Sequence, residues 1–365
     1  MTRRLLNPRA HASTVLAATV LVAAGVLAGC GGSSDMTSSS SSAGATGGGS
    51  GAGSGGGSGP HLALVAYSTP KPAYDALISQ YEHTSAGKGV TFSESFGASG
   101  SQSRAVATGQ PGDVVAFSTT PDMTRLVKAG IVSSSWDANA YKGIVSDSVA
   151  VLVVRKGNPK HITGWGDLIK PGIDVITPNP STSGSARWNI MAAYGAQLKE
   201  GKTPAQALAY VHTLLTKNVS VQDASGSAAM QTFTGGKGDA LISYESEAIA
   251  AEKKGAAIQY IVPPQTILIQ TPIAITKNGS HPAQAQAFVN WLWTPAAQAT
   301  WAQQGYRPVV KSVLAQYASE FPTPPELFTI NSLGGWTKVD NSFFAPSTGQ
   351  ITKIEQAAGV PTASS

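Results

Sequence analysis

The chain has 365 residues, with 25 Lys and Arg against 20 Asp and Glu, and 12% of its residues are charged. It contains no Lys/Arg-rich run and no basic stripe with interleaved aromatic residues, so nucleic acid is excluded as an expected partner. The one cysteine, Cys30, excludes an intramolecular disulfide framework, and the six histidines show no metal-ligand spacing. We therefore expect neither a metal nor a cofactor.

Residues 1–30 have the pattern of a secretory signal peptide. Three arginines precede an apolar run, residues 15–28, which is too short to span a membrane but suits the hydrophobic part of a signal. The sequence LAGC at residues 27–30 then resembles the lipobox of bacterial lipoproteins. That resemblance implies that Cys30 is acylated, with palmitate for example, and holds the protein in the periplasm or on the outer face of the cytoplasmic membrane. The alternative is an ordinary signal peptide with an incidental cysteine.

Residues 31–60 are almost wholly Gly, Ser, Ala and Thr. Such a segment has too little apolar surface to offset its ordering entropy, so we expect a flexible tether. A tether of this composition spans roughly 30 Å root-mean-square. Without the three arginines of the signal, 22 basic and 20 acidic side chains remain. An anionic ligand would therefore not be recruited by bulk charge.

From residue 61 onward, runs typical of strands alternate with helical patterns. The alternation predicts an α/β fold with largely parallel sheets, and the length predicts two lobes. The expected strands are Leu62–Tyr67, Gly89–Glu94, Asp113–Phe117, Ala150–Val154, Asp174–Thr177, Asp239–Ser243, Ile258–Val262 and Ile267–Ile275, and the expected helices include Ala73–Glu82, Thr120–Ala129, Pro204–Thr216 and Pro282–Trp293.

Two longer apolar runs, Val149–Val154 and Leu268–Ile275, bracket a segment with its own strands. We interpret them as two crossings of the chain between the lobes, so that the first lobe is built from both ends of the folded part. The expected division is residues 61–152 with 268–356 for the first lobe, 153–267 for the second lobe and 357–365 for a frayed C-terminal tail.

Three segments combine a strand, a turn rich in Ser and Gly, and a helix. They read FGASGSQ (96–102), ITPNPSTSGSARWN (176–189) and DASGSAAMQTF (223–233). Free backbone N–H groups and the positive end of the helix dipole at such a turn can grip a small anion. No lysine is embedded in the second turn, so it is not a Walker-type loop. Any single turn is explained as well by plain helix capping, but three in one chain favour anion binding.

With these turns, the folded part resembles the periplasmic sulfate/thiosulfate-binding proteins of ABC transporters. Further matching segments are VRKGNPKHITGWGDLIKPG (154–172), GDALISYESEA (238–248), YRP (306–308) and LFTI…LGGW (327–336). The resemblance implies an α/β, two-lobe periplasmic-binding-protein fold of type II, with two crossovers and the ligand in the inter-lobe cleft. It also implies a monomer that captures sulfate, and thiosulfate as well, and delivers it to ABC transporter permease subunits.

Carried over position by position, the resemblance implies a set of substrate-binding residues from the three turns and from residue 244. Three of them depart from the family pattern: a serine at 185 replaces glycine, a glycine at 226 replaces alanine, and a tyrosine at 244 replaces tryptophan. The implied residues are Ser99, Ser183, Gly184, Ser185, Gly226 and Tyr244.

A pocket of donors alone favours sulfate, because fully ionised sulfate has only acceptor oxygens whereas phosphate near neutral pH keeps a proton. Leaving that proton unpaired costs roughly 1–3 kcal/mol. The hydroxyls of Ser185 and Tyr244 can also accept, which softens the discrimination. We still expect sulfate to bind at least about tenfold more tightly than phosphate.

Other functions remain open from the sequence. Another tetrahedral oxyanion, such as molybdate, tungstate or phosphate, would suit the same fold, and an anchored adhesion protein that has lost transport is a further alternative. A secreted hydrolase is a weaker alternative, because the turn at Ser183 lacks the G-x-S-x-G pattern and offers no His partner in triad order. We therefore expect a binding protein and not an enzyme.

The lipobox interpretation predicts the behaviour of a Cys30→Ser variant. Without the acylated sulfur the protein should leave the membrane fraction, because stable anchoring needs the acyl chains. Detergent phase partitioning of the wild-type and variant proteins measures this. A variant that still partitions with detergent would contradict the lipoprotein interpretation.

Overall fold

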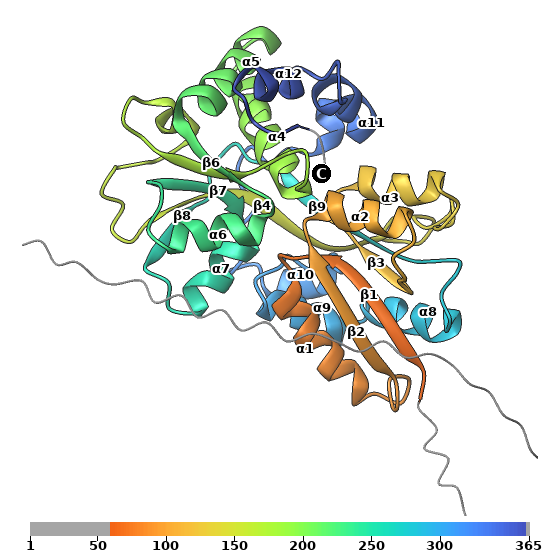
Figure 1. Ribbon diagram of the computed structural model, residues 1–365. Coiled ribbons are helices and arrows are strands. Elements are labelled where there is room, and N and C mark those ends of the chain that lie inside the picture. The colour runs from red at the N-terminus through yellow and green to blue at the C-terminus, as the bar shows by residue number, and fades with distance from the viewer. Residues whose placement is uncertain (1–58, 363–365) are drawn as a thin grey trace, which may run out of the picture. The chain divides into compact units, whose positions relative to one another are not determined.

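The computed structural model describes residues 59–362. The expected signal peptide with Cys30, the tether as far as residue 58, and residues 363–365 lie outside the described residues. Within 59–362 no helix is both long and apolar enough to cross a membrane. This part of the chain forms two lobes, each with strands covered by helices (Figure 1).

The first lobe is built on four strands in the order β2-β1-β3-β9. Strand β1 pairs in parallel with β2 and β3, and β3 pairs antiparallel with β9. The elements are β1 (His61–Tyr67), α1 (Lys71–Glu82), β2 (Thr91–Gly97), α2 (Ser99–Ala107), β3 (Val114–Ala116), α3 (Thr120–Lys128), β9 (Leu268–Ile275), α8 (Pro282–Trp291), α9 (Pro295–Gln303) and α10 (Lys311–Gln316).

The second lobe continues the strand order as β4-β7-β5-β6, with β8 paired to β4. Strand β5 pairs in parallel with β6 and β7, whereas β4 pairs antiparallel with β7 and β8. The elements are β4 (Ile144–Arg155), η1 (Trp165–Ile169), β5 (Val175–Pro178), α4 (Gly184–Lys199), α5 (Pro204–Thr213), η2 (Leu214–Asn218), β6 (Val219–Asp223), α6 (Gly226–Thr234), β7 (Ala240–Tyr244), α7 (Glu245–Lys253) and β8 (Ile258–Ile261).

Strands β4 and β9 are the two expected crossovers. They pair antiparallel with each other, with Val149 opposite Leu268 and Ile144 opposite Pro272. The end of β9 then pairs with β3 in the first lobe, and the end of β4 pairs with β7 in the second. The apolar run Val149–Val154 is buried throughout, as in a strand covered on both faces. The expectation of largely parallel sheets is wrong for these two strands, because each returns against the direction of its neighbours.

The segment after β9 is divided between the lobes. Helix α9 packs on the first lobe, where Trp301 meets Tyr74 edge-on at 5.2 Å between ring centroids. The last elements pack on the second lobe, beside α4 and α5 (Figure 1). They are η3 (Ile330–Leu333), α11 (Gly335–Val339), η4 (Asp340–Phe344) and α12 (Gln350–Ala357).

The expected assignment of all of 268–356 to the first lobe is therefore wrong for its last part. Helix α4 carries buried residues around its whole circumference, so it needs apolar cover on the side away from the sheet. Trp336 supplies part of that cover and meets Trp188 of α4 edge-on, with 4.6 Å between ring centroids.

The expected fraying of the tail is also wrong as far as residue 362. The Val360 N–H donates to the Glu355 carbonyl at 2.9 Å. The Asn179 side-chain amide donates to the Pro361 carbonyl at 3.0 Å. The tail is thus held against the loop that precedes α4.

Replacing Trp336 with Ala tests the placement of the C-terminal segment on the second lobe. Removing a buried indole from an aromatic pair should lower the free energy of unfolding by about 3–5 kcal/mol. Urea unfolding of the wild-type and variant proteins measures the difference. A loss below about 1 kcal/mol would mean that α11 does not pack on the core of the second lobe.

Candidate functional site

The three Ser/Gly turns open three helices whose N-termini meet. Ser99 is the first residue of α2, Gly184 of α4 and Gly226 of α6. The backbone N–H of Gly100 in the first lobe donates to the Thr182 carbonyl of the second at 2.9 Å. The Thr182 hydroxyl donates to the Ala224 carbonyl, just before α6, at 2.8 Å. Helix starts from both lobes are thereby brought to one place.

The candidate residues are withdrawn from solvent. Ser99, Ser183 and Ser185 are 2–3% exposed, and Tyr244 is fully buried. Gly184 and Gly226 are buried as well. A ligand held by these groups would be shielded from water, which strengthens each hydrogen bond to it.

Ser99 joins the cluster, but its proton is already committed. The Ser99 hydroxyl donates to Oδ2 of Asp122 at 2.6 Å and accepts from the Ser118 N–H at 2.9 Å. The Asp122 carboxylate in turn pairs with Arg125 at 2.9 Å. Because a hydroxyl has one proton, Ser99 cannot donate to an anion while this bond exists.

Ser183 and Ser185 share a hydrogen bond, with 2.7 Å between their hydroxyl oxygens. Ser183 also caps α4, because its hydroxyl accepts from the Ala186 N–H at 3.4 Å. A Cβ atom at Gly226 would lie 2.8 Å from the Ser185 hydroxyl and 3.0 Å from Oε2 of Glu247. A methyl group at this position would therefore crowd both side chains, so the serine at 185 and the glycine at 226 are complementary in size.

Tyr244 meets Ser118, a residue that the sequence did not single out. Their hydroxyl oxygens are 2.7 Å apart. The Ser118 carbonyl accepts from the Trp188 indole N–H at 2.7 Å. A Cβ atom at Gly184 would lie 2.8 Å from the Ser118 Cβ. Ser118 therefore lies at the centre of the cluster and connects Ser99, Gly184 and Tyr244.

The sequence contains a weak sign of Ser118. The run VVAFST ends in two hydroxyl residues just before α3 begins, which repeats the pattern of a strand, hydroxyls and a helix. The run has no glycine, so it did not stand out beside the three Ser/Gly turns.

Further contacts close the lobes on each other. The Ser227 hydroxyl donates to the Ser68 hydroxyl at 2.6 Å, and the Thr69 hydroxyl donates to Oε1 of Glu247 at 3.0 Å. On the opposite flank the Arg104 guanidinium donates to the Ser181 carbonyl at 3.4 Å. The described structure is thus a closed form held by two hydroxyl donors, one carboxylate acceptor and one guanidinium donor among these contacts.

Burial shifts the pKa of two ionisable groups at the cluster. Burial raises the pKa of the Glu247 carboxyl, and hydrogen bonds from the Ser243 and Thr69 hydroxyls lower it in part. Burial also raises the pKa of the Tyr244 phenol well above its usual value. Both effects arise because a charged form is poorly solvated in this interior.

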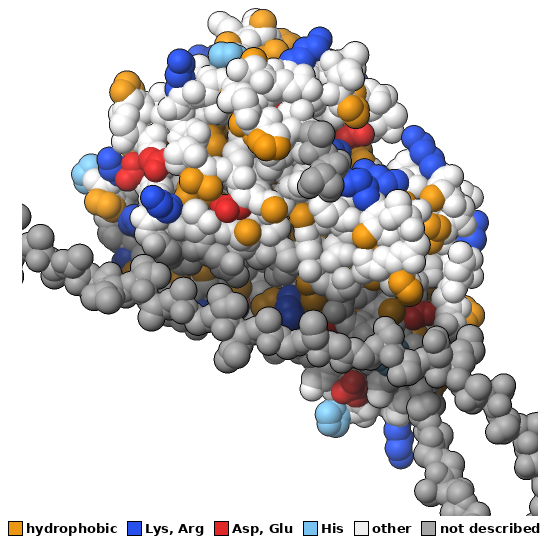
Figure 2. All heavy atoms as spheres, in the orientation of Figure 1, with side chains coloured by type: hydrophobic (Ala, Val, Ile, Leu, Met, Phe, Trp, Pro, Cys, Tyr) orange, Lys and Arg blue, Asp and Glu red, His pale blue; other side chains and the backbone are white. Residues whose placement is uncertain are grey.

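Three arginines line a groove at the rim of the lobes, where Lys and Arg side chains gather over α2 and α3 (Figure 2). Arg187 is paired with Asp340 at 2.5 Å and so stabilises the packing of η4 instead of pointing at the cluster. Burial lowers the pKa of Arg104, and the neighbouring Arg125 lowers it further. Within residues 59–362 no group of three His, Cys, Asp or Glu side chains is placed to hold a metal.

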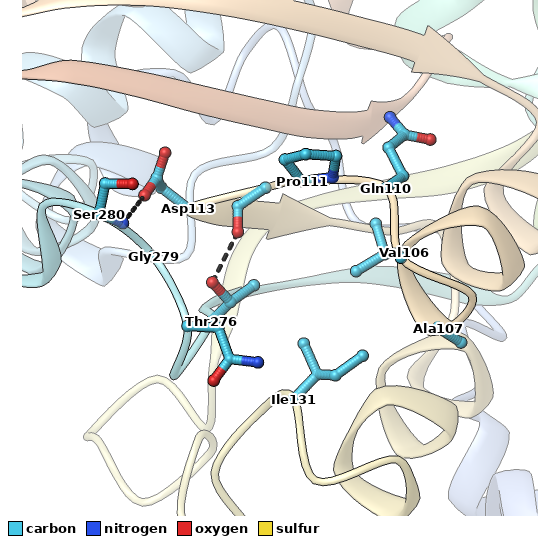
Figure 3. A pocket seen from close by; sticks show the side chains of 12 residues that line it. Val106, Ala107, Gln110, Pro111, Asp113, Ile131, Thr276, Gly279 and Ser280 are labelled. Carbon is cyan, nitrogen blue, oxygen red and sulfur yellow. Dashed lines mark hydrogen bonds between the residues drawn. The ribbon is translucent and has the colours of Figure 1, made fainter.

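A separate surface pocket of about 250 Å³ lies at the other end of β3 (Figure 3). Its one charged side chain is Asp113, whose carboxylate accepts from the N–H groups of Ala63 at 2.7 Å and Ser280 at 2.8 Å. A carboxylate that already joins β1 to the loop before α8 offers nothing to an anion. This pocket is structural.

The two-lobe body with two crossover strands and a buried polar cluster between its lobes defines a ligand-binding protein that closes on its ligand. The family model of bacterial extracellular solute-binding proteins matches residues 62–307, and the chain belongs to this family. The resemblance found in the sequence is therefore confirmed, and the family places the protein outside the cytoplasm.

Relatives and a solved structure agree. A sulfate-binding protein of Synechococcus elongatus is 39% identical over 306 residues, which cover 81% of this chain and 87% of the relative. A thiosulfate-binding protein of Pseudomonas aeruginosa is 33% identical, over 74% of this chain and 84% of the relative. The structure of the sulfate-binding protein SubI of Mycobacterium tuberculosis has a TM-score of 0.76 and 47% identity, over 77% of this chain and 98% of that one. These relatives are solute-binding proteins, not enzymes.

The complementary sizes of Ser185 and Gly226 can be tested by a double-mutant cycle. Gly226→Ala should lower the free energy of unfolding by about 1–3 kcal/mol, because the new methyl group meets the Ser185 hydroxyl. Combining it with Ser185→Gly should recover the part of that loss that comes from the Ser185 hydroxyl, while the contact with Oε2 of Glu247 remains. Thermal and urea unfolding measure both effects.

Gly166→Ala is the control, because a Cβ there meets nothing within 4 Å. It should change stability by less than about 1 kcal/mol. Losses at Gly226 that simply add to those at Ser185 would show that the two positions are independent.

Proposed function

We propose that this protein captures sulfate, and thiosulfate as well, outside the cytoplasm and delivers it to the permease of an ABC transporter. One observation carries the proposal: the hydroxyl and N–H groups of three helix N-termini, from both lobes, meet in one buried cluster. Such groups bind an oxyanion without needing a positive side chain. The proposed ligand contacts are Ser99, Ser183, Gly184, Ser185, Gly226 and Tyr244. Ser99 would contribute its backbone N–H at the start of α2, because its hydroxyl proton is bonded to Asp122.

The named relatives support the choice of ligand. A sulfate-binding and a thiosulfate-binding protein are each similar to most of this chain, and so is SubI. Sulfate and thiosulfate are both tetrahedral dianions with acceptor atoms only, so a cluster of donors suits both.

Closure of the lobes is the proposed signal to the transporter. The anion would bridge the turn at Ser183–Ser185 to the first lobe and shift the population towards the closed form. The bonds from Ser227 to Ser68 and from Gly100 to Thr182 support this, because they join the two lobes. We infer a lobe division near residues 152 and 267, as the sequence indicates.

We further propose that the protein is a monomeric lipoprotein anchored through acylated Cys30. A flexible tether over residues 31–60 would let the folded body reach a permease in the same membrane. A bound anion would thus stay close to the translocation pathway.

We propose binding without catalysis. The Ser183 hydroxyl is hydrogen-bonded to Ser185 and to a backbone N–H, and no histidine contacts it among the bonds of the described residues. A hydrolytic serine needs a base within hydrogen-bond reach.

The proposal predicts how binding responds to loss of the Ser183 hydroxyl. The wild-type protein should bind sulfate with micromolar affinity, about −8 kcal/mol, and at least about tenfold more tightly than phosphate. Ser183→Ala should weaken sulfate binding by roughly tenfold, the usual contribution of one hydrogen bond to a charged group. Isothermal titration calorimetry measures both quantities.

Thr203→Ala is a matched control, because Thr203 caps α5 in the same way but lies outside the cluster. It should cost about the same helix stability, near 1 kcal/mol, and leave sulfate affinity unchanged. Failure of the wild-type protein to bind sulfate or thiosulfate would contradict the proposed function.

A further inference from the structure

The hydroxyl pair of Ser118 and Tyr244 is the part of the cluster that the implied ligand contacts do not explain. Ser118 follows β3 in the first lobe, and Tyr244 ends β7 in the second. Both residues are fully buried, and their hydroxyl oxygens are 2.7 Å apart although 126 residues separate them in the chain.

The pair lies among the proposed ligand contacts. The backbone N–H of Ser118 donates to the Ser99 hydroxyl. Ser118 also packs so closely on Gly184 that a Cβ atom added there would lie 2.8 Å from the Ser118 Cβ. The Ser99 proton is committed to Asp122. Among the contacts around Ser99 and Gly184, the Ser118–Tyr244 pair therefore provides hydroxyl protons that bridge the lobes and have no fixed carboxylate acceptor.

The hydrogen bond between two hydroxyls can run in either direction. If Ser118 donates to Tyr244, the phenol proton of Tyr244 can point to a ligand. If Tyr244 donates to Ser118, the phenol oxygen can accept a proton from a ligand, and the Ser118 hydroxyl donates elsewhere. Either oxygen of this pair can be the donor. A tryptophan at this position, as in the family pattern, has an N–H that can only donate.

Tyr244 keeps its proton at neutral pH. Burial is the main cause of its raised pKa, and the nearby carboxylates Glu247 and Asp122 add to it. The pair therefore keeps both hydroxyl protons over the physiological pH range, and its hydrogen bond can run in either direction.

We propose that the Ser118–Tyr244 pair is a reversible donor and acceptor that widens the ligands of this site from fully ionised tetrahedral oxyanions to singly protonated ones, such as hydrogen phosphate. The inference rests on the proposed function, since it assumes that an oxyanion binds in this cluster. It makes Ser118 a specificity-determining residue of the site.

The test compares sulfate and phosphate affinities of the wild-type protein and a donor-only variant at pH 7. The variant combines Tyr244→Trp with Ser118→Ala, which removes the hydroxyl pair and leaves an indole N–H that can only donate. The wild-type protein should bind phosphate measurably, within about a hundredfold of sulfate. The variant should keep its sulfate affinity within about threefold and lose phosphate affinity by at least about tenfold, because the ligand proton has lost its acceptor.

Two further variants separate specificity from structure. Tyr244→Phe has neither donor nor acceptor, so it should weaken both anions and show the pattern of a loss without a change in specificity. If the double variant fails to fold, the comparison of sulfate and phosphate binding by the wild-type protein still tests the proposal. Tyr210→Phe is the control, because its buried hydroxyl donates to the Trp165 carbonyl far from the cluster. It should change neither affinity.

The outcomes distinguish the two proposals. Sulfate binding without measurable phosphate binding in the wild-type protein overturns the role of the pair and leaves the proposed function intact. Equal losses for both anions in the donor-only variant also overturn it, since they indicate a purely structural pair. Binding of neither anion to the wild-type protein overturns the proposed function itself.

Discussion

The antiparallel pairing of β4 with β9 is the constraint on which the position of the cluster depends. Each strand leaves this pair into a different lobe, and the register that sets Val149 opposite Leu268 fixes where each lobe begins. Two adjacent hydrogen-bonded strands allow a hinge motion but resist sliding, because a slip of one residue reverses every side chain. Helix starts on the two lobes therefore meet at the same place whenever the lobes close.

The cluster would bind an anion through neutral hydrogen-bond donors. Its groups are hydroxyls and helix N-termini, whereas the nearby arginines are tied to other partners, Arg125 to Asp122 and Arg187 to Asp340. Burial makes each hydrogen bond stronger and an unpaired polar group more costly. Selectivity among oxyanions then depends on which hydroxyls have a proton to give and which have a lone pair to offer, and so on the partners of each hydroxyl.

Much of this arrangement follows from short stretches of sequence. The turns at Ser183–Ser185 and Gly226 are visible because a strand, small residues and a helix start follow one another within a few residues. Ser118 has only a weak local signal, because its turn contains no glycine, and Glu247 has none. Their partners, Tyr244 and Thr69, are 126 and 178 residues away in the chain, so their roles exist only once both lobes are folded. The resemblance to the family placed Tyr244 but could not indicate what its hydroxyl meets.

The sequence by itself determined the α/β class, the two crossover strands and the three helix starts, because periodicity, turn residues and helix capping are local properties of the chain. The tertiary structure decided three other points. It committed the Ser99 proton to Asp122, set Ser185 into the space left by Gly226, and packed residues from Ile330 onward on the second lobe. Each of these depends on which groups become neighbours after long-range packing. A hydroxyl has one proton to donate, and a small space admits one side chain, so the neighbours decide how both are used.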